Sequence, residues 1–155
     1  FAYLLDIYPT LCDIGGVSIP STVEGKSLKP VLTGNIQQTR DVMFFAYKNF
    51  QRAVRKDRWK LIKYNVKNEV ITQLFDLIED PYEIKNLAKN PEYKSQLEEM
   101  NKLLIQQMIE NNDLADLKKE GWGVPVLPAW KDKVDEETLE NLRGLAEKER
   151  KMRGF

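Results

Sequence analysis

Histidine is absent from this chain of 155 residues. Its absence removes the commonest general acid and base at neutral pH and the commonest metal ligand in proteins. The sequence also has no glycine-rich phosphate loop, no cysteine pattern with metal-ligand spacing and no nucleophile elbow. We therefore predict no catalytic residue and no metal ligand in this chain.

Other features that the sequence lacks exclude an internal disulfide and a membrane span. Cys12 is the single cysteine, so no internal disulfide can form and the redox compartment stays open. The 24 basic and 24 acidic residues cancel, so the net charge implies no nucleic-acid partner. Apolar runs are far shorter than the roughly 18 residues that cross a bilayer, so no membrane span is expected. The chain opens without Met or a signal-type segment, which indicates a piece of a longer protein.

The segment Arg52–Asp80 organises the sequence, because it consists of consecutive β-forming runs. Alternating and aromatic residues begin at Val42, and the polar break Lys56–Arg58 divides the next run into a hairpin. A further run, Val70–Phe75, follows a polar turn. Four short strands with tight links predict a small antiparallel sheet.

A long helix is predicted after Asn90 and Pro91. Its apolar residues lie within a narrow arc at 3.6 residues per turn, and they are Tyr93, Leu97, Met100, Leu104 and Met108. This stripe can cover one face of the sheet. The expected fold class is therefore α+β, with a four-stranded antiparallel sheet packed against a long helix.

The N-terminal segment predicts another helix. Apolar residues from Leu4 to Cys12 recur at helical spacing, Asp6 can cap the helix, and Gly15–Gly16 is a stop signal. The connector that follows is rich in proline and glycine, with one helical turn expected around Leu28–Leu32.

An acidic cluster follows the last strand. Asp80, Pro81 and Glu83 form a capping arrangement, which predicts that a short helix begins at Pro81. The four carboxylates of this cluster could hold calcium, but capping and turn roles already account for two of them. The cluster consists of Asp76, Glu79, Asp80 and Glu83.

Basic residues gather on the hairpin: Arg52, Arg55, Lys56, Arg58, Lys60 and Lys63. They could attract an anionic substrate to a nearby pocket. A solvated hairpin face is the favoured interpretation.

The C-terminal residues have two characters. Gly121–Trp130 is too apolar for a solvated linker and too rich in proline for a helix, so an extended segment is predicted. Acidic residues near Asp135 and basic residues near Arg150 predict a final, exposed helix.

Several segments together resemble the C-terminal portion of type I sulfatases, and they occur in the order found in that family. They are Asp6–Leu11 with Gly15–Gly16, Val23–Leu28, Ala53–Ile62, and Leu74–Leu77 with Asp80–Pro81, Glu83 and Asn86–Ala88. The resemblance covers roughly residues 3 to 110.

The resemblance implies a parent enzyme of the alkaline-phosphatase-like superfamily that hydrolyses sulfate esters with a formylglycine and a bound calcium. Both cofactors are expected in a catalytic domain upstream of this chain, and no catalytic residue can be carried over. Residues 1–40 would be the last helix and connector of that domain. Residues 41–110 would be the C-terminal subdomain, and residues 111–155 would be an extension.

The expected role is to brace the catalytic domain and to line its substrate cleft. The candidate substrate-binding residues are Tyr47, Arg52, Arg55 and Trp122, and the expected substrate is a sulfated glycan or an aryl sulfate. The resemblance is compatible with a periplasmic or secreted parent. Two alternatives stay open, a free-standing interaction module and part of a related phosphatase or phosphodiesterase.

Overall fold

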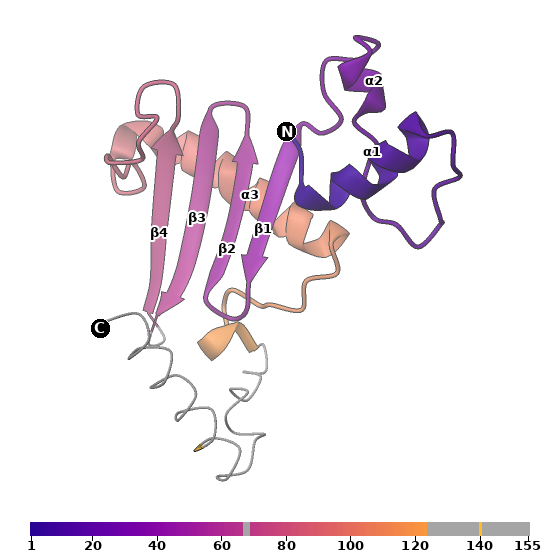
Figure 1. The fold of residues 1–155 in the computed structure, drawn as a ribbon. Helices are drawn as coiled ribbons and strands as arrows, with labels where there is room; N and C mark the ends of the chain where they lie inside the picture. The colour runs from indigo at the N-terminus through magenta and orange to yellow at the C-terminus, as the bar shows by residue number, and fades with distance from the viewer. Residues whose placement is uncertain (67–68, 124–139, 141–155) are drawn as a thin grey trace, which may run out of the picture. The chain divides into compact units, whose positions relative to one another are not determined.

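A four-stranded antiparallel sheet forms the core of the structure, a computed structural model that describes residues 1–66, 69–123 and 140. The strands are β1 (Val42–Tyr47), β2 (Gln51–Lys56), β3 (Trp59–Val66) and β4 (Glu69–Asp76). They lie in chain order, each paired with its sequence neighbour (Figure 1). The predicted sheet is confirmed.

Helix α3 (Lys94–Glu110) covers one face of this sheet (Figure 1). A 3-10 turn, η2 (Pro91–Tyr93), precedes the helix, and the side chain of Asn90 accepts a hydrogen bond from Glu92 N–H at 3.1 Å. In the core, three buried residues of α3 pack against one row of residues that runs across the strands. The helix contributes Met100, Leu104 and Met108, and the row consists of Val54, Leu61 and Leu74. The predicted stripe therefore faces the sheet, and the α+β class is confirmed.

The opposite face of the sheet carries a smaller apolar cluster. Ala53, Ile62 and Phe75 are buried there, with Tyr64 and Leu77 packed against them. These residues alternate with those under α3, as the two-residue period of a strand requires.

The N-terminal segment begins with a 3-10 turn, η1 (Leu4–Asp6), and continues as α1 (Ile7–Ile14). Gly15 ends the helix, and Gly16 has a φ of +69°, which glycine adopts without steric cost. The connector contains α2 (Lys29–Leu32). The predicted helix, its stop and the later helical turn are confirmed. The predicted cap is not, because the Asp6 side chain makes no capping hydrogen bond to α1 and pairs with Arg40 instead.

On each of the two edge strands, β1 and β4, a side chain from outside the sheet hydrogen-bonds to backbone groups that face away from the neighbouring strand. On β1, the Tyr3 hydroxyl accepts from Phe44 N–H at 2.6 Å and donates to Phe44 C=O at 3.0 Å. On β4, the Asn86 amide accepts from Leu74 N–H at 3.0 Å and donates to Thr72 C=O at 3.1 Å. Each contact satisfies backbone groups that the ladder leaves unpaired.

The prediction of a helix beginning at Pro81 is wrong. Pro81 lies in a turn, and Glu83 has a φ of +55°, which a right-handed helix does not allow. The carboxylate of Glu83 instead accepts from Lys60 Nζ, with both oxygens at 2.7 Å. A long-range ion pair thus replaces the local capping role.

The described residues belong, apart from Glu140, to one compact unit, Phe1–Val124. They include a last 3-10 turn, η3 (Glu120–Gly123). The extended segment predicted up to Trp130 and the predicted final helix lie mostly outside the described residues. The division at residues 40 and 110 stays a prediction. None of the described helices has the length and apolarity needed to span a bilayer.

Replacing Leu104 with Ala should lower the free energy of unfolding by about 2 to 5 kcal/mol, because it leaves a cavity under the sheet. Urea unfolding followed by circular dichroism measures this. Leu114→Ala is the matched control, since Leu114 is 86% exposed. Equal effects of the two substitutions would contradict the packing of α3 described above.

Candidate functional site

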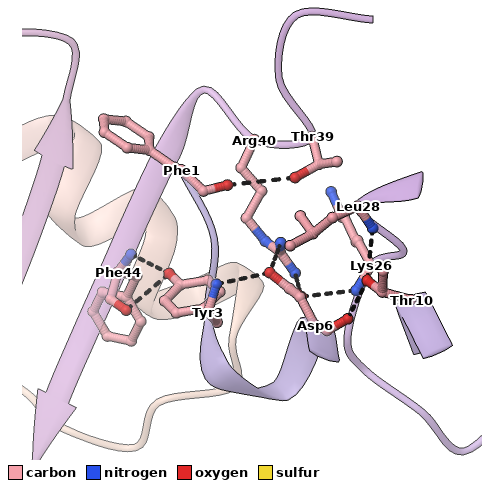
Figure 2. Close-up of polar contacts among 9 residues, drawn as sticks. All are labelled: Phe1, Tyr3, Asp6, Thr10, Lys26, Leu28, Thr39, Arg40 and Phe44. Atoms are coloured by element: carbon pink, nitrogen blue, oxygen red, sulfur yellow. Dashed lines mark hydrogen bonds and ion pairs between the residues drawn. The ribbon is translucent and has the colours of Figure 1, made fainter. Parts of the chain in front are cut away.

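The carboxylate of Asp6 is fully buried and forms the centre of a polar network (Figure 2). Its oxygens accept from the N–H groups of Tyr3 at 2.7 Å and Lys26 at 2.8 Å. The guanidinium of Arg40 donates two further hydrogen bonds, at 2.5 and 2.7 Å. One carboxylate therefore ties the start of α1 to the connector and to the residues just before β1.

The connector lies close against α1. The Thr10 hydroxyl donates to Asp6 C=O at 2.6 Å and accepts from Leu28 N–H at 2.8 Å. A Cβ at Gly25 would lie 2.1 Å from the carbonyl oxygen of Leu5, so a side chain at this position would force the backbone apart. Glycine at position 25 thus lets Lys26 N–H reach Asp6.

The surroundings of Asp6 lower its pKa below the ordinary value of 3.8. Burial alone raises this pKa, because it penalises the charged form. The hydrogen bonds from Arg40, Lys26 and Tyr3, with the charge of Arg40, outweigh that effect. Asp6 is therefore an ionised structural group, not a proton donor at neutral pH.

A polar pocket of about 420 Å³ adjoins this network. Tyr3, Lys26 and Arg40 line it from the N-terminal segment, and Gln107 and Glu110 line it from α3. Arg40 also lies 4.9 Å from the centre of the Tyr3 ring. Arg40 is paired with Asp6, and three carboxylates, those of Glu24, Asp41 and Glu110, line the pocket beside Lys26, so its charge does not favour an anion.

Arg52 and Trp122, two of the predicted substrate-binding residues, meet in a buried cluster. The Arg52 guanidinium lies 5.4 Å from the centre of the Trp122 ring. It also pairs with the Asp113 carboxylate, donating from Nη2 at 2.9 Å. Arg52 is 3% exposed and Trp122 is fully buried, so both stabilise the fold in this structure.

Tyr47, the third predicted residue, is the last residue of β1 and is exposed next to the turn that joins β1 to β2. Its ring stacks on Phe50, with ring centres 6.4 Å apart. Lys48 Nζ lies 5.7 Å from the centre of the Tyr47 ring. Arg52 donates from Nη1 to Lys48 C=O at 2.7 Å, which links this turn to the buried cluster.

Arg55 lies apart from Arg52 and Trp122, whereas the strand register puts Tyr47 on the same face of the sheet as Arg55. It follows Arg52 by three residues on β2, so it belongs to the opposite face of the sheet. Its guanidinium lies 5.0 Å from the centre of the Phe1 ring. That all four residues bind substrate stays a prediction. The structure brings Arg52 and Trp122 together, and Tyr47 precedes Lys48, whose C=O accepts from Arg52.

The acidic residues after β4 form no metal site among the described residues. Asp76 pairs with Arg58, Glu83 pairs with Lys60, and Asp80 accepts from Lys85 N–H at 2.7 Å. Across residues 1–66, 69–123 and 140, no group of three or more carboxylate, thiol or imidazole side chains could hold a metal ion. This part of the chain does not fit the calcium that the resemblance implies.

The sequence interpretation missed three residues that the site depends on. Arg40 and Asp113 lie 34 and 61 residues from their partners Asp6 and Arg52, so no local pattern indicates the pairing. Lys48 was visible as a basic residue between the aromatic residues Tyr47 and Phe50. That signal could have placed it with Tyr47.

Asp6→Asn should lower the free energy of unfolding at neutral pH by about 3 kcal/mol, because Arg40 is left buried without its counter-charge. The folded-state pKa of Asp6 is depressed, so its contribution is present above pH 3.8 and is lost as the pH falls through the lower folded value. Urea unfolding at neutral pH and at a series of acidic pH values measures this. The difference between wild type and variant should narrow in acid.

Asp57→Asn is the control, since Asp57 is exposed in the β2–β3 turn. A pH-independent difference for Asp6→Asn would show that ionisation of Asp6 does not stabilise the fold.

Comparison with known proteins gives consistent matches. The chain is 35% identical over 117 residues to the Delta 4,5-hexuronate-2-O-sulfatase of Bacteroides thetaiotaomicron, covering 70% of this chain and 24% of that protein. It is 36% identical over 110 residues to an arylsulfatase of Clostridium perfringens, covering 68% and 22%. The chain thus spans about a quarter of the length of these relatives.

A solved structure shares the fold described above. It is a protein in complex with its substrate D-glucosamine-2-N,6-O-disulfate, with a TM-score of 0.62 and 28% identity. The match covers 74% of this chain and 25% of that one. Together with the relatives, it confirms the resemblance to sulfatases.

A family model described as "N-sulphoglucosamine sulphohydrolase, C-terminal" matches residues 2–115. The matched region contains the sheet, α3 and the Asp6 network. Because it spans well over half of the chain, this protein belongs to the N-sulphoglucosamine sulphohydrolase C-terminal family of sulfatases.

Proposed function

We propose that this chain is the non-catalytic C-terminal part of a sulfatase and that it packs against a catalytic domain preceding it in the same polypeptide. Its coverage of 24% and 22% of two sulfatase relatives supports this, because most of a protein of that length is not in this chain. The chain would brace the catalytic domain.

The outward face of α1 is the observation that carries this proposal. Ile7, Leu11 and Ile14 of α1 recur at helical spacing with Leu4 of the preceding turn η1, and all four are exposed, Leu11 at 64%. The polar groups of the same segment, Asp6 and Thr10, face inward and are buried. A helix with its polar side inside and its apolar side outside needs a further partner to cover it.

The upstream domain is the partner that this geometry favours. Residues 1–40 are expected to be the last helix and connector of that domain, so the chain itself would hold this apolar face beside the rest of it. The Asp6 network would fix the angle of α1 relative to the sheet. A shift of α1 would then be transmitted to the domain packed on it.

The proposed reaction is hydrolysis of a sulfate ester, for which the formylglycine and calcium would belong to the upstream domain. The substrate would be a sulfated glycan or an aryl sulfate. Names of the matched proteins support these classes, since they include a hexuronate-2-O-sulfatase, an arylsulfatase and a protein bound to a sulfated glucosamine. In this chain, the residues around the β1–β2 turn would line the cleft.

Removing residues 41–155 from the full-length protein should abolish most activity toward a fluorogenic aryl sulfate. A small displacement of catalytic groups can cost on the order of 100-fold in rate, and the unbraced domain should suffer at least that. Full activity of the shortened protein would rule out the bracing role. A full-length protein that cleaves the matching aryl phosphate and leaves the sulfate intact would indicate a phosphatase instead.

Leu11→Asp in the full-length protein should lower its free energy of unfolding by about 2 to 5 kcal/mol, since it places a charge in the proposed interface. Ile84→Asp is the control, because Ile84 is also exposed, at 83%, but lies in the loop after β4. Denaturant unfolding and residual activity are the measurements. If the two variants behave alike, α1 does not contact the catalytic domain.

A further inference from the structure

We propose that the β1–β2 turn binds a sugar ring of a sulfated saccharide. Tyr47 and Phe50 would form the stacking surface, and Lys48 would contact a sulfate group. These three residues are called the turn platform below. The inference rests on the proposed function, because it assigns the substrate contact of this chain to one short segment.

The aromatic pair has the form of a surface for a pyranose ring. Tyr47 is 58% exposed and Phe50 is 44% exposed, although aromatic side chains of this size are usually buried when the fold can bury them. Their rings lie at 29° to one another with centres 6.4 Å apart, so they present a broad apolar area. The C–H groups of a sugar carry slight positive charge and pack favourably on the negative face of such rings.

Lys48 adds a positive charge at the edge of that area. Its Nζ lies 5.7 Å from the centre of the Tyr47 ring, and its side chain is exposed. An ammonium group makes charge-assisted hydrogen bonds to anionic oxygens. A sugar stacked on Tyr47 would therefore bring a sulfate substituent within reach of Lys48.

The turn is held in shape before any ligand arrives. Lys48 has a φ of +46°, which is unfavourable for a residue with a side chain. The buried Arg52 stabilises this conformation by donating to Lys48 C=O at 2.7 Å and to Gln51 C=O at 2.8 Å. Because Asp113 neutralises Arg52, this arginine is a positioning residue, and Lys48 supplies the available charge.

A rigid turn favours binding, since little conformational entropy is lost when the ligand docks. Phe50 is fixed as well, because its N–H donates to Tyr47 C=O at 3.0 Å and its C=O accepts from Asn65 N–H at 2.7 Å.

The turn platform differs in charge from the proposed domain interface on α1. The exposed face of α1 is apolar, and no lysine or arginine occurs between Leu4 and Ile14. The turn platform instead combines aromatic rings with a cation. That combination complements a ligand with one apolar face and anionic substituents, as a sulfated sugar has.

The test uses the full-length protein with Tyr47→Ala or Lys48→Gln. Binding of D-glucosamine-2-N,6-O-disulfate and of unsulfated D-glucosamine is followed by fluorescence titration at low temperature, where turnover is slow. KM and kcat for a fluorogenic aryl sulfate are measured in parallel. Tyr82→Ala and Lys85→Gln are matched controls, because both residues are exposed in the loop after β4.

Each platform variant should weaken binding of the sulfated sugar about tenfold, the effect of losing one aromatic or ionic contact. Lys48→Gln should leave binding of unsulfated D-glucosamine unchanged. For the aryl sulfate, both platform variants should raise KM more than they lower kcat, because the turn contacts substrate and does not hold the catalytic groups. The controls should match wild type throughout.

The inference is overturned if wild type does not bind the sulfated sugar, or if the platform variants bind it as wild type does. A fall in kcat for the aryl sulfate with KM unchanged would also overturn it, since that would indicate a bracing contact at the turn. Absence of all sulfatase activity in wild type, with sugar binding that still depends on Tyr47, would refute the proposed function and leave the binding site standing.

Discussion

A single buried carboxylate, that of Asp6, holds together the segments that precede the sheet. Two backbone N–H groups and both terminal nitrogens of Arg40 are aimed at its oxygens. Isolated in an apolar interior, this charge would be strongly unfavourable, so the surrounding donors and the arginine must be present together. The network should therefore form cooperatively, because a buried Asp6 carboxylate with only some of its donors would destabilise the fold.

The same rule applies to the other buried charges of the described residues. Arg52 pairs with Asp113, and Asp76 pairs with Arg58, which lowers the pKa of Asp76. Each pair joins segments far apart in sequence. These charged groups are used to fix positions, which agrees with a chain that supports chemistry performed elsewhere.

Local periodicity was enough to predict the sheet, α3 and α1 from the sequence. Strand alternation and the Met100–Leu104–Met108 spacing are set by backbone geometry, so the core faces follow directly from them. The short helix at Pro81 was predicted wrongly because Glu83 forms an ion pair with Lys60 in place of the local cap. Tertiary contacts of this kind leave no local pattern.

Less of the candidate site could be predicted, because the burial of its side chains also depends on tertiary contacts. Tyr47 and Arg52 could be selected as an aromatic and a basic residue on the strands, but their exposure could not be inferred. Arg52 is buried because Asp113 folds back from beyond α3, and Tyr47 is exposed because the turn ends the sheet. The exposure of a side chain such as Arg52 thus depends on residues far away in the sequence.

The side chains that close the two outer strands have a consequence for the behaviour of the protein in solution. An open strand edge is a template on which another molecule can add its own strand, the first step toward aggregates. The Tyr3 hydroxyl and the Asn86 amide occupy the backbone groups at Phe44, Thr72 and Leu74, so a foreign strand cannot pair there without displacing them. A small sheet is thereby discouraged from edge-to-edge association with other copies of itself.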